Sequence, residues 1–139
     1  MSLTKILDLA GGALNAQTVR LNTIASNLAN AETVAGSPTE AYRAKRPVFE
    51  TMLTESKAGL ASSYGVKVNS ITELQRANPQ VFSPDNPMAD QDGYVYRSNV
   101  NPLEEMTDML EASRAYESSL SVSSTARELL MRTIDMSTK

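Results

Sequence analysis

The chain contains no cysteine, no histidine and no tryptophan among its 139 residues. Without cysteine it forms no disulfide and no thiolate metal site, so its composition suits a reducing or an oxidising compartment equally. Without histidine it lacks the commonest general base and zinc ligand. No apolar run approaches about 18 residues, the length that identifies a candidate membrane-spanning helix. These absences argue against zinc chemistry, histidine-dependent catalysis and a membrane span.

Recognisable catalytic and phosphate-binding motifs are also missing. The sequence has no Walker loop, no dinucleotide-binding glycine motif and no nucleophile elbow. Its net charge is −3, from 13 basic and 16 acidic residues, so no basic field is available to hold nucleic acid. We therefore expect no enzyme activity, no cofactor, no metal, no small-molecule substrate and no nucleic-acid partner.

One acidic run needs separate consideration, because Asp90, Asp92 and Gly93 resemble part of a calcium loop. Aligning Gly93 with the glycine of such a loop puts Met88 first and Asn99 last, and neither supplies the ligand required there. A carboxylate-based hydrolase using the two acids is also unconvincing, because they lie in a proline-rich loop with no flanking aromatic cleft. The pattern favours a proline-bounded turn.

The C-terminal third of the chain predicts one long helix. Asn101 is a suitable N-cap, Pro102 occupies the first helical position, and Glu104 falls three residues after the cap. A helix of about 35 residues spans about 50 Å, which is more than a small domain can cover. The helix therefore needs a partner of similar length. Apolar or aromatic residues follow at helical spacing at Leu103, Met106, Met109, Leu110, Tyr116, Leu120, Leu130, Met131 and Ile134.

Residues 3–30 predict a second helix that supplies this partner. Its outer face carries few charges and many small amides and hydroxyls, such as Asn15, Thr18 and Asn22. A solvated helix usually carries charge pairs on that face, so this composition favours burial against further protein surfaces. Its heptad seam, with one polar member, comprises Leu3, Leu7, Ala10, Leu14, Gln17, Leu21, Ile24 and Leu28.

The middle of the chain predicts an insert of extended and irregular segments. Residues 31–41 form a turn, residues 42–49 an extended piece, residues 64–71 the clearest strand and residues 94–96 a short one. Residues 50–60 predict a short helical turn. Arg43, Lys45 and Arg46 admit contact with phosphate or lipid, but a solvated strand edge is favoured.

The predicted fold is therefore mainly α, with the terminal helices paired as an antiparallel coiled coil. Residues 1–30 and 100–139 form a discontinuous helical domain, and residues 31–99 form a β-rich insert. The residues expected to pack between the helices or between subunits are Leu3, Leu7, Leu14, Leu21, Ile24 and Leu28, facing Met106, Met109, Tyr116, Leu120, Leu130 and Ile134.

Two stretches resemble the bacterial flagellar rod, hook and hook-associated axial proteins. Residues 21–31 (LNTIASNLANA) are similar to the N-terminal signature of that family. Residues 92–101 (DGYVYRSNVN), followed by Glu105-Met106 and by residues 112–117 (ASRAYE), are similar to its C-terminal signature in the form typical of rod subunits. The signature polar residues are Asn27, Asn30, Arg114 and Glu117. Because each subunit of a rod must be held by several neighbours, polar residues such as Asn27 and Asn30 are expected to join hydrogen bonds between subunits.

The resemblance implies a structural subunit of the proximal rod of the flagellar basal body. Such a subunit leaves the cytoplasm through the flagellar type III export apparatus without a cleaved signal peptide, assembles in the periplasm and transmits torque. Its implied partners are other copies of itself, the rod proteins FlgB, FlgF, FlgG and FliE, and the inner-membrane ring. The alternatives are a cytoplasmic helical-hairpin chaperone or adaptor of the export system, and a different proximal-rod paralogue.

Overall fold

The computed structural model describes residues 3–54 and 63–137. Its elements follow the order α1 (Leu3–Ala29), β1 (Val34–Ala35), β2 (Lys45–Thr54), β3 (Ser63–Glu73), β4 (Gln80–Phe82), β5 (Tyr94–Arg97) and α2 (Pro102–Ser137). The two helices have 27 and 36 residues. The prediction of long terminal helices with a β region between them is thus confirmed. Within the described ranges, neither helix has the length and hydropathy needed to cross a membrane.

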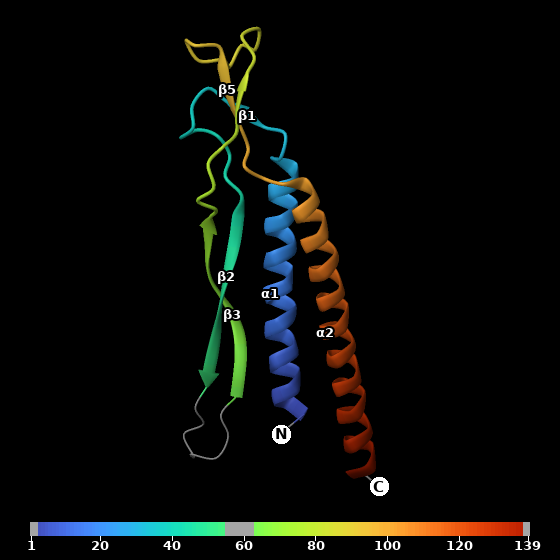
Figure 1. The fold of residues 1–139 in the computed structure, drawn as a ribbon. Helices are drawn as coiled ribbons and strands as arrows, with labels where there is room; N and C mark the ends of the chain where they lie inside the picture. Colours follow the sequence, from blue (N-terminus) through green and yellow to red (C-terminus); the bar gives the residue numbers. More distant parts are fainter. Residues whose placement is uncertain (1–2, 55–62, 138–139) are drawn as a thin grey trace.

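The molecule is elongated, with three layers along most of its length. The β2–β3 hairpin lies along one side of α1, and α2 lies along the other side (Figure 1). The two helices run in opposite directions, so the N- and C-terminal ends lie together (Figure 1). Strands β1 and β5 lie at the opposite end, where the insert joins the helices. α1 is therefore the central layer of the fold.

The strands form two separate antiparallel sheets. β2 pairs with β3 from Lys45 opposite Glu73 to Thr54 opposite Ser63, with a register shift between Val48 and Phe49. β5 is the centre of a small sheet of order β1-β5-β4. The helical turn predicted for residues 50–60 is wrong for residues 50–54, because these residues belong to β2 and pair with β3. Residues 55–60 lie outside the described residues. The pairing of β1 and β4 with β5 was not predicted.

The acidic run forms the turn between β4 and β5. Asp90 Oδ1 accepts hydrogen bonds from the backbone N–H groups of Asp92 (3.0 Å) and Tyr94 (2.8 Å). Gly93 adopts a φ of 80°, which favours glycine. Burial, and then the neighbouring Asp90 carboxylate, raise the pKa of Tyr96 above its usual 10.0. The acids at 90 and 92 are thus part of a turn, as the prolines around them indicated.

The face of α2 that lies against α1 alternates small and large side chains, and alanines occupy two of its most buried positions. Ala112 is 0 % exposed and Ala126 is 3 % exposed. Small side chains let two helix backbones approach closely, so little space is available for a larger side chain at Ala112 or Ala126. We call it the inner seam; its buried or half-buried residues share two positions of one heptad repeat and are Glu105, Met109, Ala112, Tyr116, Ser119, Ser123, Ala126 and Leu130.

Three residues expected to face α1 are not part of the inner seam. Met106, Leu120 and Ile134 are each more than half exposed in the single chain. They do not pack closely on α1 within the single chain, so packing between subunits remains the prediction for these three residues. Met109, Tyr116 and Leu130, from the same predicted set, are half-buried on the inner seam.

Candidate functional site

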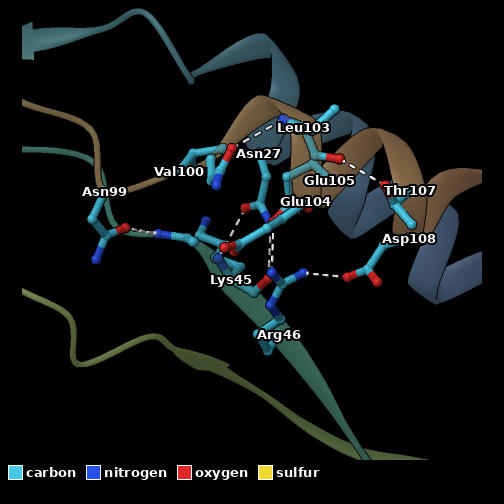
Figure 2. A network of polar contacts seen from close by, with 12 residues as sticks. Asn27, Lys45, Arg46, Asn99, Val100, Leu103, Glu104, Glu105, Thr107 and Asp108 are labelled. Carbon is cyan, nitrogen blue, oxygen red and sulfur yellow. Dashed lines mark hydrogen bonds and ion pairs between the residues drawn. The ribbon is translucent and has the colours of Figure 1, made fainter.

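A network of polar contacts joins the C-terminal end of α1, the start of β2 and the start of α2 (Figure 2). We call it the junction network and define it as Asn27, Lys45, Arg46, Glu105 and Asp108. These residues come from three elements that are far apart in the sequence. The network lies where the helices meet the insert, so it fixes how these parts are joined.

Asn27 is the centre of the junction network and is 0 % exposed. Its Nδ2 donates to the Lys45 carbonyl (2.9 Å), and its Oδ1 accepts from the Lys45 backbone N–H (2.9 Å). The side-chain amide thus pairs with the start of β2 as a neighbouring strand would. Nδ2 also donates to Glu105 Oε2 (3.0 Å), and Oδ1 accepts from the Tyr42 hydroxyl (3.1 Å). Two donated and two accepted bonds satisfy the amide fully.

Glu105 places a carboxylate in the interior, with only 1 % of its side chain exposed. Arg46 Nη2 lies 2.8 Å from Glu105 Oε1 in an ion pair that is not aligned as a hydrogen bond. Arg46 Nη1 donates to Asp108 Oδ2 at 2.9 Å, so one guanidinium joins two acids on successive turns of α2. Arg20 of α1 lies 3.6 Å from Asp108 on its other side. Because a buried charge is costly when unpaired, Arg46 is required by Glu105.

Two further asparagines hold the insert to the chain that leads into α2. Asn99 is 5 % exposed; its Oδ1 accepts from the backbone N–H of Ala44 (2.6 Å), and its Nδ2 donates to the carbonyls of Leu74 and Arg76. Asn78 Nδ2 donates to the carbonyls of Tyr42 and Arg97. Side-chain amides therefore satisfy backbone groups that no regular sheet pairs.

A second candidate surface is the apolar residues of α2 that face away from α1. Six of them are between 51 and 73 % exposed in the single chain. We call this surface the outer seam: Leu103, Leu110 and Met131 share one heptad position, and Met106, Leu120 and Ile134 share another. α2 thus carries two heptad seams, and within residues 3–54 and 63–137 the six apolar side chains of the outer one remain more than half exposed.

The remaining predicted residues lie apart from both features or at their edges. Asn101 Oδ1 accepts from the Leu103 backbone N–H (3.1 Å), which is N-cap geometry. Glu104 lies 3.8 Å from Arg76 and is exposed. Asn30 Nδ2 donates to the Ser26 carbonyl one turn earlier in α1.

The two signature residues of α2 are exposed, whereas the predicted leucines of α1 are half-buried. Arg114 and Glu117 are exposed on α2. In α1, Ile24 is 2 % exposed, whereas Leu3, Leu7, Leu14, Leu21 and Leu28 are half-buried.

Sequence reasoning missed the roles of Arg46 and Glu105. Arg46 was interpreted as one of three cations at a solvated strand edge, but it is paired with two acids of α2. A signal was available: Glu105 lies among the signature residues at the start of α2, and Arg46 falls at the start of the extended segment. Nothing in the sequence, however, states that the two segments meet.

Comparison with known proteins gives a consistent result over the whole chain. Residues 7–36 match the family described as flagella basal body rod protein, and residues 91–136 match the C-terminal family of flagellar basal body rod FlgEFG proteins. The flagellar basal-body rod protein FlgC of Salmonella typhimurium is 42 % identical over 136 residues, 98 % of each chain. FlgC of Escherichia coli O6:H1 is 41 % identical over the same share, and FlgC of Aquifex aeolicus is 37 % identical over 97 % of each chain.

Proposed function

The chain belongs to the FlgC family of flagellar basal-body rod proteins, which are structural subunits and not enzymes, and on this premise we propose that it transmits torque as a subunit of the proximal rod. Torque passes along a shaft only if each subunit is held by several neighbours. The proposal therefore needs surfaces on this chain that a single copy leaves uncovered.

The outer seam is the observation that carries the proposal. Its six apolar side chains lie at regular heptad positions along α2, from Leu103 to Ile134, and all are more than half exposed. Polar residues occupy the intervening positions of the same seam: Ser113, Glu117, Ser124 and Arg127. Soluble monomers rarely expose six large apolar side chains along one face of a helix, because covering them is favourable by about 25 cal/mol per Å². A helix of a neighbouring subunit has the matching length and periodicity to cover this row.

The organisation of the subunit follows from the two seams. We infer that α1 and α2 pair through the inner seam as an antiparallel coiled coil, within a helical domain of residues 1–30 and 100–139. Residues 31–99 then form the insert, whose β2–β3 hairpin lies on the side of α1 opposite α2 and whose small sheet lies at the end of the molecule. The small side chains of the inner seam support close pairing, and the outer seam leaves α2 able to join a second helix pair.

The setting of such a subunit is the periplasmic part of the basal body, after export by the flagellar type III apparatus without cleavage of a signal peptide. Its neighbours would be other copies of the chain, the rod proteins FlgB, FlgF, FlgG and FliE, and the inner-membrane ring. Asn27 and Asn30 were expected to bond between subunits. Asn27 is fully satisfied within the chain, so Arg114 and Glu117, both exposed, are the better candidates for such bonds.

The test uses Leu120→Asp in a strain that lacks the chromosomal copy of this gene. Leu120 is 51 % exposed, so a charge there leaves the single chain folded but places an unpaired carboxylate in the seam between subunits. We expect normal expression and loss of swimming in soft agar. Ile24→Asp is a poorer test, because Ile24 is 2 % exposed and the charge would disrupt the subunit itself.

The matched control is Ser118→Asp, which adds the same charge to an exposed position on the opposite side of α2 from Leu120. It should swim normally. Normal swimming of the Leu120→Asp variant would contradict the proposal that the outer seam holds the rod together.

A further inference from the structure

We propose that Arg46 is a positioning residue that sets the orientation of the β2–β3 hairpin relative to the helix pair. The inference concerns the geometry of the single chain. It therefore stands or fails independently of the proposed role in the rod.

The hairpin contacts α2 through side chains rather than through close packing of the two backbones. Among residues 3–54 and 63–137, both hairpin strands approach α1, but neither strand's backbone approaches α2. Arg46 crosses this separation from the start of β2 and contacts Glu105 and Asp108 (Figure 2). Its guanidinium pairs with two acids at once, through a hydrogen bond to Asp108 and an ion pair with Glu105, so two separate contacts hold the end of the side chain.

Arg46 and Asn27 hold the start of β2 to two different helices. Asn27 fixes the backbone of Lys45 to α1, and the next residue, Arg46, fixes its side chain to α2. Asn99 also holds Ala44 at the base of the hairpin, and both strands lie along α1, but these contacts do not join the hairpin to α2. Arg46 adds a contact directed at the second helix, which restricts rotation of the hairpin about the axis of α1.

The burial of Glu105 makes its ion pair with Arg46 necessary for the stability of the folded chain. Its side chain is almost fully buried, and the nearest cation is Arg46 at 2.8 Å. If the hairpin turned away, the carboxylate would remain in the interior without a counter-charge. The orientation in which Arg46 reaches Glu105 is therefore favoured over others that keep the same α1 contacts.

The experiment measures distances between spin labels in the full chain, which has no native cysteine to interfere. One pair, Thr51→Cys with Ser118→Cys, spans from the hairpin to α2, and a reference pair, Asn22→Cys with Ser118→Cys, spans from α1 to α2. All three positions are exposed. In the Arg46→Met variant we expect loss of the narrow 51–118 distance peak and no change in the 22–118 peak.

A double variant separates positioning from stability. Arg46→Met alone leaves Glu105 unpaired and lowers the urea midpoint of unfolding, whereas Arg46→Met with Glu105→Gln removes both charges and keeps an oxygen for Asn27 Nδ2. We expect the double variant to recover the midpoint but not the 51–118 peak. Arg97→Met removes an exposed ion pair between Arg97 and Glu32, whose N–O distance is similar to that of Arg46 and Glu105. This control should leave both spin-label distances unchanged.

Three results would overturn the proposal. The first is an unchanged 51–118 peak in Arg46→Met, including the case in which the unmodified chain already lacks a narrow peak. The second is recovery of that peak in the double variant, which would mean that Arg46 acts through stability alone. The third is loss of the peak in Arg97→Met.

Discussion

Replacing Asn27 with alanine removes the side chain on which the junction network depends. Three groups then lose their partner: the backbone N–H and carbonyl of Lys45, and Glu105 Oε2. An unsatisfied buried polar group costs about 1–3 kcal/mol. Lys45 is half-buried, so water reaches its backbone groups, and the buried Glu105 carboxylate keeps its ion pair with Arg46; the lower value is therefore appropriate for each group. The expected loss is about 3 kcal/mol in total.

A smaller effect acts in the opposite direction. Alanine has a better helix propensity than asparagine by roughly 0.5 kcal/mol, so the net loss is about 2.5 kcal/mol. Urea unfolding of a chain of this size has a slope of roughly 2 kcal/mol per M. The urea midpoint, followed by the helical circular dichroism signal, should therefore fall by roughly 1 M.

The control is Asn22→Ala, an exposed position on the same helix that makes the same change in propensity. It should alter stability by no more than about 0.5 kcal/mol. Asn27→Asp should be worse than Asn27→Ala, because it replaces the donor Nδ2 with an oxygen that faces the Lys45 carbonyl and the Glu105 carboxylate. The reasoning fails if Asn27→Ala and Asn22→Ala unfold at the same urea concentration.

Two further substitutions test the inner seam and the turn before β5. Ala112→Leu adds bulk at a position with 0 % exposure and should cost about 1–3 kcal/mol in urea unfolding, whereas Ser118→Leu on the exposed face should cost little; equal midpoints would refute a tight seam. Gly93→Ala imposes a φ of 80° on a residue with a Cβ, which would lie 3.0 Å from the Phe82 ring. It should cost about 1–2 kcal/mol and speed amide hydrogen exchange in β4 and β5, and unchanged exchange would contradict the strain argument.

The two long helices were predictable because their signals are local. Asn101 and Pro102 mark the start of α2, and heptad spacing continues without proline or glycine to its end. The β3 strand was predictable from alternation over residues 64–71. In contrast, β1 and β4 have two and three residues. They exist because β5 lies between them, and no local pattern reports such pairing.

The choice between the two seams of α2 could not be made from hydrophobicity. Large apolar residues such as Met106 and Leu120 mark the outer seam strongly, whereas Ala112 and Ala126 mark the inner seam weakly. The expectation that the most hydrophobic positions are buried within the chain holds when a chain folds alone. A subunit with two interfaces can use its largest apolar residues for the second one, and a sequence pattern does not distinguish these cases.

The residues of the junction network are far apart in the sequence, and this affects the order in which contacts form during folding. Asn27 bonds to residues 18 and 78 positions away, and Arg46 to one 62 positions away. The β2–β3 hairpin closes over a much shorter loop than the contacts to α2, so it can form early, whereas the bonds to Glu105 and Asp108 form only when the start of α2 packs beside α1. Contacts that form last contribute little to the rate of folding and mainly slow unfolding. The buried amide and ion pair should therefore act chiefly on the lifetime of the folded subunit.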